Sequence, residues 1–539
     1  MKYTIHLSLL FSLILVASSA KSQPSIQWQK CLGGTKHDQP GGMLPTRDGG
    51  YIMAGSSVSS DGDLTTNHGN YDLWIVKINS LGAVQWQRSY GGSGEESGGA
   101  IIESVDGGYI IASNTNSDDG DLKGIFTGST NQSDLWVLKI DSIGNIVWQK
   151  IFGGSKNDFP TSIVRGGEGQ YLISAYTTSS DGDVENFHGG TGGDIWVLDV
   201  SESGSLGWQK TFGGSNDDFG AIYETAGGYA IAGYTNSTDG DVKGRARDTT
   251  VEAWLVQLDR NANIIWQKTY GGSGYDGAYS MSPTFDKGCI LAGFTGSDDG
   301  DVSGIHQPKY FFDSWIIKVD SLGTIEWQKC LGGSNGDEAY SVFQNSDGDY
   351  VVSANVASEN GDVTGFQGGS DCWIFKLSKT GNLLWQRTLG GTGPDASSGC
   401  AIMPANDSGY LVLTMTWSDD GDVHGRHGDS NDVDVWLVKL APELRDVRTS
   451  KNSADQLQAV YPNPTSGRMV ISYQLSTTSE LKIELFNILG VKIRSIVISK
   501  EAPGSYEQQF DISDLQPGSY FFRIEKEGKS VLQRIELIK

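Results

Sequence analysis

Carboxylate side chains recur at two fixed places in this sequence. Pairs of them stand in Asp-Gly-Asp segments, for example Asp299 with Asp301 and Asp420 with Asp422. Ca²⁺ takes about six to eight oxygen ligands, which neighbouring acidic loops can supply. The candidate Ca²⁺ or ligand contacts are therefore these four residues and Asp276. Single acids also stand five residues after the first glycine of seven Gly-Gly-Ser/Thr segments, namely Asp38, Glu96, Asp158, Asp218, Asp276, Asp337 and Asp395.

Turn formation is the competing explanation for these acids. Asp side chains accept hydrogen bonds from nearby backbone N–H groups, and the accompanying glycines supply positive φ angles. Residues 271–276 match half of a calcium β-roll repeat, but that fold needs tandem copies about every nine residues. The spacing also differs from that of an EF-hand loop. Turn formation is therefore favoured for any one loop, no metal is assigned, and Ca²⁺ remains possible.

Other residues that could act on a ligand are few. Trp417 interrupts the pattern of its repeat near the acidic loops, where it could stack on a sugar ring or simply pack against a neighbouring loop. The histidines fall in variable loops without a second metal ligand at a suitable spacing. No Gly-x-Ser-x-Gly segment leads from a predicted strand into a predicted helix, as a nucleophile elbow would. Glycoside hydrolysis by a pair of acids remains an alternative, because any two of so many carboxylates could stand at a suitable separation.

Two series of tryptophans recur about every 60 residues and indicate what positions these acids. A tryptophan side chain buries roughly 150–250 Å². Packing of the hydrophobic core therefore explains the spacing, and a catalytic role is not needed. One series lies in Trp-Gln-Lys/Arg segments, at Trp28, Trp86, Trp148, Trp208, Trp266, Trp327 and Trp385. The other lies in apolar segments, at Trp74, Trp136, Trp196, Trp254, Trp315, Trp373 and Trp436.

Each repeat predicts four short antiparallel strands. In one unit they cover 253–258, 264–270, 278–283 and 288–294, and no helical period interrupts them. Seven such units predict an all-β, seven-bladed β-propeller over 24–442. We expect the long loops, such as 295–313, to connect one blade to the next. Six blades then fit between residues 72 and about 415, and both ends of the region build the seventh, which removes a free strand edge.

The repeat motifs resemble a known family of exported bacterial proteins. Gly-Gly-Ser/Thr, Asp-Gly-Gly-Tyr, Ser-x-Asp-Gly-Asp and Asp-x-Trp-x-Val-Lys over about residues 25–442 are similar to SBBP-type seven-bladed propeller repeats. The resemblance supports the number of blades. It implies no activity, because that repeat family has no single shared one.

The last part of the chain predicts a separate small domain. After a polar linker at 443–456, residues 457–539 alternate like a β-sandwich of immunoglobulin type. Their motifs resemble the type A sorting domain of the type IX secretion system, which directs passage across the outer membrane and is typically cleaved. The resemblance implies the type IX machinery as a partner. The matching residues are Tyr461, Pro462, Asn463, Pro464, Gly467, Gly490, Gly518, Tyr520 and Lys539.

Compartment and charge narrow the function further. Residues 1–20 are typical of a signal peptide, and no segment is long and apolar enough to be a transmembrane segment. The formal net charge is −25, which argues against nucleic acid as a partner. The five cysteines are too scattered for a disulfide framework.

Together these features predict a secreted or outer-membrane surface-attached protein that binds an unknown glycan or protein ligand, as a binding or adhesion module without an evident catalytic site. The alternative is an extracellular polysaccharide-acting enzyme, a glycosidase or lyase. It would use carboxylates on the propeller face where the acidic loops gather.

Overall fold

The computed structural model describes residues 23–539 except 127, 129–130, 191, 246–249, 307–310, 397–398, 430, 444–455, 462–466, 476, 488–491, 517, 527–528 and 538–539. The predicted signal peptide at 1–20 and nearly all of the predicted linker lie outside the described residues. The chain divides into two compact units, Met1–Glu443 and Leu444–Lys539. Each unit is described by itself below.

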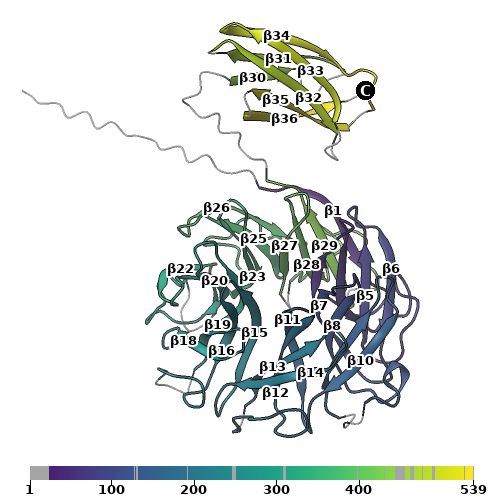
Figure 1. Ribbon diagram of the computed structural model, residues 1–539, viewed down its shortest axis with the longest axis vertical. Coiled ribbons are helices and arrows are strands. Elements are labelled where there is room, and N and C mark those ends of the chain that lie inside the picture. Colours follow the sequence, from purple (N-terminus) through teal and green to yellow (C-terminus); the bar gives the residue numbers. More distant parts are fainter. Residues whose placement is uncertain are drawn as a thin grey trace, which may run out of the picture. The chain divides into compact units, whose positions relative to one another are not determined.

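The first unit consists of seven antiparallel sheets around a common axis (Figure 1). Its described residues contain one 3₁₀ turn, η1 (Gly120–Leu122), and otherwise only strands and loops, so the all-β prediction is confirmed. The first three blades are β2 (Asp38–Gln39), β3 (Met43–Pro45), β4 (Tyr51–Ser57), β5 (Asp72–Ile78) and β6 (Val84–Tyr90); β7 (Glu96–Glu103), β8 (Tyr109–Thr115), β9 (Asp134–Ile140) and β10 (Ile146–Phe152); and β11 (Asp158–Arg165), β12 (Gln170–Thr177), β13 (Asp194–Ser201) and β14 (Leu206–Phe212).

The remaining blades have the same order. They are β15 (Asp218–Thr225), β16 (Gly228–Thr235), β17 (Glu252–Leu258) and β18 (Ile264–Tyr270); β19 (Asp276–Pro283), β20 (Cys289–Thr295), β21 (Asp313–Val319) and β22 (Ile325–Leu331); β23 (Asp337–Gln344), β24 (Tyr350–Val356), β25 (Asp371–Leu377) and β26 (Leu383–Leu389); and β27 (Ala401–Pro404), β28 (Tyr410–Thr416) and β29 (Asp434–Leu440) with β1 (Ile26–Leu32). The first strands of neighbouring blades, such as β11 and β15, contact each other and line the axis (Figure 1).

The predicted strands are correct, but the predicted division into blades is wrong. The long loop at 295–313 connects β20 to β21, which pair within one sheet. The short Gly-Gly-Ser segment after β18 instead leads to β19 in the next blade. Five residues, 271–275, make this connection, and an extended segment of that length spans up to roughly 17 Å. Blade boundaries therefore fall at the Gly-Gly-Ser/Thr segments, and six continuous blades run from residue 38 to residue 389.

The seventh blade is closed by the N-terminal strand, as predicted. β1 pairs with β29 along its length, so Lys30 stands opposite Leu437 and Leu32 opposite Val435. Only β1 crosses over, because the strands that follow it build the first blade with β5 and β6. The pairing leaves no open edge on β29.

The hydrophobic core of this unit lies between the blades. Seven buried clusters alternate with the seven sheets, and each combines side chains from two neighbouring blades. One of them joins Leu411 and Leu437 of the seventh blade to Met53 and Trp74 of the first. Seven interfaces for seven sheets mean a closed ring, since an open array would have one interface fewer.

The two tryptophan series have different roles. The tryptophans of the third strands, such as Trp254, are fully buried, and their indole nitrogens donate to the glutamine of the adjacent Trp-Gln strand. The Nε1–Oε1 distances are 2.8–3.2 Å in all seven blades, and in the seventh the bond from Trp436 to Gln29 joins the two ends of the propeller. Five tryptophans of the outer strands instead cover a turn glycine of the next blade, as Trp28 covers Gly82. These contacts explain the repeat without any functional role.

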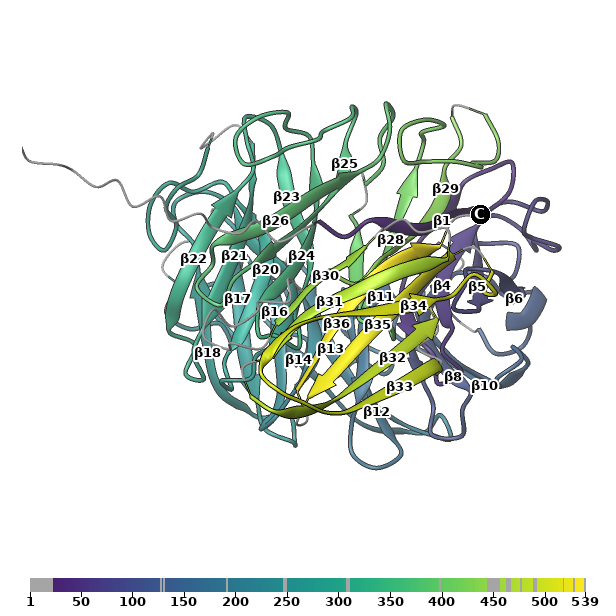
Figure 2. The ribbon, with the colours of Figure 1, turned by 90° about the horizontal axis from the view of Figure 1, so that it is seen from above.

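The second unit contains two antiparallel sheets with a core of their own. Side chains such as Ile483, Phe510 and Phe522 fill that core. Figure 2 shows the four-stranded sheet with its strands side by side. The strands are β30 (Gln456–Tyr461), β31 (Arg468–Leu475) and β34 (Gly504–Asp511) in one sheet, and β33 (Lys492–Glu501), β32 (Ser479–Asn487), β35 (Gly518–Lys526) and β36 (Lys529–Leu537) in the other.

Candidate ligand-binding end of the propeller

The acid after each Gly-Gly-Ser/Thr segment is buried where a blade begins. Asp276 accepts hydrogen bonds from the Gly272 N–H (2.8 Å) and from the hydroxyls of Thr295 and Ser297. The equivalent acids of the other blades accept the same backbone bond at 2.6–3.0 Å. These carboxylates therefore fix the segment that crosses between blades.

The Asp-Gly-Asp loops hold the same segments from outside. Asp299 accepts from the Ser273 N–H (2.6 Å) and Asp301 from the Gly271 N–H (3.2 Å). In the seventh blade Asp420 accepts the Thr392 N–H at 2.7 Å, while Asp422 accepts from Gln367 and lies 3.6 Å from the Arg387 guanidinium. Asp276, Asp299 and Asp301 thus meet in the fifth blade, whereas Asp420 and Asp422 belong to the seventh. Among the residues that the structure describes, no three His, Cys, Asp or Glu side chains are grouped to hold a metal ion.

A second set of buried acids begins the third strands. Four of them, Asp72, Asp194, Asp313 and Asp434, accept from both the backbone N–H and the Nδ1 of a loop histidine, namely His68, His188, His306 and His427. Sequence reasoning missed these pairs, although an acid two residues before a repeated tryptophan and a histidine upstream were a usable signal. The histidines therefore anchor loops, which explains their presence without metal binding.

Burial weakens the acidity of several members of these two sets. Desolvation raises the pKa of Asp38, Asp134 and Asp371 to about 7, and that of Asp218 and Asp337 to about 6. The two sets also face each other across the blade junctions, so the charge of Asp158 contributes to the raised pKa of Asp134. Near neutral pH the junctions consequently hold protons.

An open polar hollow of about 470 Å³ lies between the first and second blades at this end. It is lined by hydroxyl, amide and carboxylate side chains and by backbone, without a cationic group: Asn70, Ser93, Gly94, Glu95, Asn116, Ser117 and Asp118. Its donors and acceptors suit a polar, uncharged or cationic ligand.

Aromatic side chains on the third to sixth blades, half-buried except for the buried Phe294, form what we call the aromatic arc: Tyr176, Phe219, Tyr234, Tyr279, Phe294, Phe312 and Tyr340. Phe219 stacks on Tyr234, with ring centroids 5.3 Å apart. Tyr279 and Tyr340 stack at 4.7 Å, and both hydroxyls lie within 3.2 Å of the Glu338 carboxylate. The first two blades have Gln39, Gly41, Ser97 and Gly99 at the corresponding strand positions, so the arc breaks the near-identity of the blades. That asymmetry was readable from the aligned repeats but was not used.

Tyr279 and Tyr340 owe their positions to irregularities in the inner strands. The register of β19 against β20 shifts between Ala278 and Ser280, and that of β23 against β24 shifts between Ala339 and Ser341. Each tyrosine is the extra residue of a β-bulge, which redirects its side chain. Trp417, the aromatic residue singled out in the sequence, lies in the seventh blade outside the arc, half-buried, with its backbone N–H bonded to Pro394 O (3.0 Å).

Several predicted sorting residues are visible in the second unit. Gly467 has φ +128°, and a Cβ there would lie 2.6 Å from the Ser513 backbone. Tyr520 is buried and donates to the Gln516 carbonyl (2.7 Å), and Gly518 begins β35. Tyr461 ends β30, while Pro462, Asn463, Pro464, Gly490 and Lys539 lie outside the described residues.

Comparison with known families settles what this unit is. Residues 459–538 match the family described as the secretion system C-terminal sorting domain. The C-terminal unit is a secretion sorting domain. Cargo with this domain is exported by the type IX secretion system, so the protein is secreted or attached to the outer-membrane surface. In the described part of the chain no helix is both long and apolar enough to span a membrane.

Similarity to other known proteins is more distant. The regulatory protein FlaEY of Caulobacter vibrioides is 25% identical over 391 residues, which are 69% of this chain but only 36% of that protein. PorZ of Porphyromonas gingivalis, described as a surface component of the type IX secretion system, is 11% identical with a TM-score of 0.37, and the match covers 93% of this chain and 59% of PorZ. Sqt1 of Chaetomium thermophilum is 10% identical with a TM-score of 0.35, over 82% of this chain and 97% of Sqt1.

Proposed function

We propose that the propeller is the ligand-binding part of this exported protein and that its ligand is a glycan. The observation that carries the proposal is the aromatic arc. Sugar rings present C–H faces that pack against aromatic rings, and their hydroxyls donate to carboxylates such as Glu338. Half-buried rings fixed by their neighbours offer such a surface with little loss of side-chain entropy on binding.

The charge of the protein restricts the kind of glycan. The net charge is −25, while the sorting domain region 457–539 carries 10 Lys/Arg and 9 Asp/Glu, so the acidic excess belongs to the rest of the chain. Such a surface repels polyanions. We therefore expect neutral polysaccharides to bind and sulfated or uronate-rich ones to be rejected.

The candidate carboxylates also favour binding over catalysis. Asp276, Asp299 and Asp420 each accept backbone N–H groups that shape the loops. An acid used in this way stabilises structure, and moving its proton would disturb a turn. Ca²⁺ at these loops stays a separate proposal, which the melting temperature with and without chelator can test.

The decisive experiment is a glycan array with the purified propeller, followed by a hydrolysis assay on every glycan retained. We expect retention without turnover, and loss of at least tenfold in affinity for Tyr340→Ala. Tyr275→Ala is the matched control, because Tyr275 is 52% exposed and lies outside the arc. Unchanged glycan binding by a folded Tyr340→Ala variant would contradict the proposal. Hydrolysis of the retained glycan would contradict it as well. Loss of binding in Asn116→Ala but not in Tyr340→Ala would place the ligand in the polar hollow and would also contradict it.

A further inference from the structure

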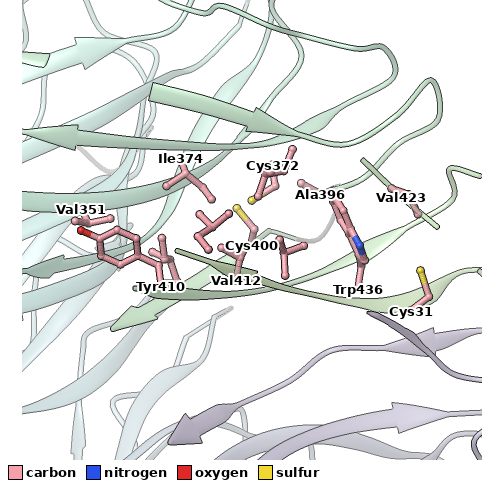
Figure 3. Packing of buried hydrophobic residues seen from close by; sticks show 14 of the residues in the cluster. Cys31, Val351, Cys372, Ile374, Ala396, Cys400, Tyr410, Val412, Val423 and Trp436 are labelled. Carbon is pink, nitrogen blue, oxygen red and sulfur yellow. The ribbon is translucent and has the colours of Figure 1, made fainter. Parts of the chain in front are cut away.

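Two cysteines from different blades meet in the core between the sixth and seventh blades. Cys372 lies in β25 and is fully buried, and Cys400 directly precedes β27 with 2% of its surface exposed. Figure 3 shows their sulfur atoms pointing toward one another within one hydrophobic cluster. The Cys400 thiol is also one of the neighbours that raise the pKa of Cys372.

The backbone around Cys400 is held against the sixth blade. Its carbonyl accepts from the Ser353 hydroxyl (2.6 Å), and its Sγ lies 3.3 Å from the Ala354 carbonyl oxygen. Ala354 stands opposite Trp373, the residue next to Cys372. The backbone on which each of the two cysteines stands is therefore held in place by β24 and β25.

The other cysteines lack such a partner. Cys31 shares the cluster but lies apart from the pair in Figure 3. Cys289 and Cys330 belong to the fifth blade, on the non-adjacent strands β20 and β22. Sequence spacing alone could not distinguish the pair, because 28 residues separate Cys372 from Cys400 and only blade packing brings them together.

The export route supplies the redox condition. A chain with a type IX sorting domain leaves the reducing cytoplasm and crosses the periplasm, where disulfides form and persist. We propose that Cys372 and Cys400 are joined by a disulfide bond in the exported protein, which links the sixth blade covalently to the seventh.

The reaction needs an oxidant of the protein-disulfide class. The thiolate of one cysteine attacks the disulfide of the oxidant and releases one of its thiols, and the second cysteine thiolate then displaces the other. The two cysteines lose two protons and two electrons, and the oxidant leaves as a dithiol. Burial and the neighbouring thiol raise the pKa of Cys372 well above its usual value, so the exchange precedes the packing of the two blades.

The test uses full-length protein secreted by its host and purified without reductant. It is alkylated in denaturant and digested with trypsin and an Asp/Glu-specific protease, because a tryptic peptide 330–376 contains both Cys330 and Cys372. We expect one linked peptide joining Cys372 to Cys400, and alkylated Cys31, Cys289 and Cys330. Alkylation of both Cys372 and Cys400 in this sample would overturn the proposal.

Two variants make the result independent of one assay. Reductant should lower the melting temperature of the wild type and of Cys330→Ala by several degrees, but should leave that of Cys372→Ala unchanged. Equal sensitivity of all three proteins to reductant would count against the link. If Cys372→Ala fails to fold, the proposal is still tested by whether the peptide that links Cys372 to Cys400 is found in the wild type and in Cys330→Ala. Glycan binding is not part of the measurement, so this proposal and the proposed function can fail separately.

Discussion

At the scale of single residues, the buried acids at the blade junctions make the stability of the propeller depend on pH. An acid whose pKa is raised by folding stabilises the folded state fully below its unfolded pKa of about 4 and loses that contribution as the pH rises through the folded pKa. For Asp38, Asp134 and Asp371 the folded pKa is about 7. We therefore expect the free energy of unfolding to fall between about pH 5 and pH 8, as measured by urea denaturation.

The variant Asp371→Asn isolates one such junction. Asp371 Oδ2 accepts the Gln367 N–H (2.6 Å), while its Oδ1 is buried without a partner near the Asp395 carboxylate. An amide keeps the first bond and presents N–H groups to Asp395. We expect the variant to be more stable than wild type by about 1 kcal/mol or more at pH 8, with little difference at pH 5. Asp420→Asn, on an exposed acid, is the control, and equal destabilisation of Asp371→Asn at both pH values would refute the explanation.

Residue patterns predicted the acids but not their partners. Seven repeated carboxylates could be found by spacing. Their hydrogen bonds to the backbone of the Gly-Gly-Ser/Thr segments are of the kind that the turn explanation describes. The pairing of Asp194 with His188, and the meeting of Tyr279 with Tyr340, depend on strand order and on β-bulges that place residues of different blades together. Such contacts are set by tertiary structure, which a single sequence does not display.

At the scale of elements, strand positions were predictable and their grouping was not. Alternating apolar residues and turn glycines located β17 to β20 within two residues of their ends. The blade boundary was wrong because loop length was taken as the sign of a crossing between blades. In fact the short Gly-Gly-Ser/Thr segment, held by the buried acid, makes the crossing, and the long loop connects two strands of one blade.

The closing strand β1 gives a testable consequence of this arrangement. Removing residues 23–32 exposes the edge of β29 and breaks the bond from Trp436, which is fully buried, to Gln29. We expect the shortened chain to melt at least 5–10 °C lower than the intact propeller, since several kcal/mol of buried area are lost, and to associate through the free edge. Differential scanning calorimetry and light scattering measure the two effects.

The matched comparison for the closing strand is Gln149→Ala, which removes the same indole bond from a continuous blade. This substitution should cost about 1–3 kcal/mol, because it leaves the N–H of the buried Trp136 without its acceptor and removes the bond from Gln149 to the Asp121 carbonyl. If the shortened chain were as stable as Gln149→Ala, closure by β1 would not be needed for the ring.

At the scale of the whole molecule, the two units have separate cores, so folding and export should be separable. The clusters of the propeller are built from residues up to 440, and that of the sorting domain from residues 469–537. We expect a chain of residues 23–443 to fold with an unchanged melting temperature. The same reasoning predicts that it is no longer delivered to the cell surface, because the sorting domain is what the secretion machinery recognises.

A point substitution tests this separation without removing any segment. Gly467→Ala places a Cβ 2.6 Å from the Ser513 backbone at a φ of +128°, which alanine adopts only with strain. Destabilisation of the sorting domain should leave the propeller transition in calorimetry unchanged while reducing the secreted fraction, measured by immunoblot of culture medium against cell extract. Gly504→Ala is the control, because Gly504 lies in the same domain and a Cβ there meets the nearest atoms at an ordinary 3.4 Å. A loss of the propeller transition in Gly467→Ala would show instead that the two units fold together, and export would then depend on the whole chain.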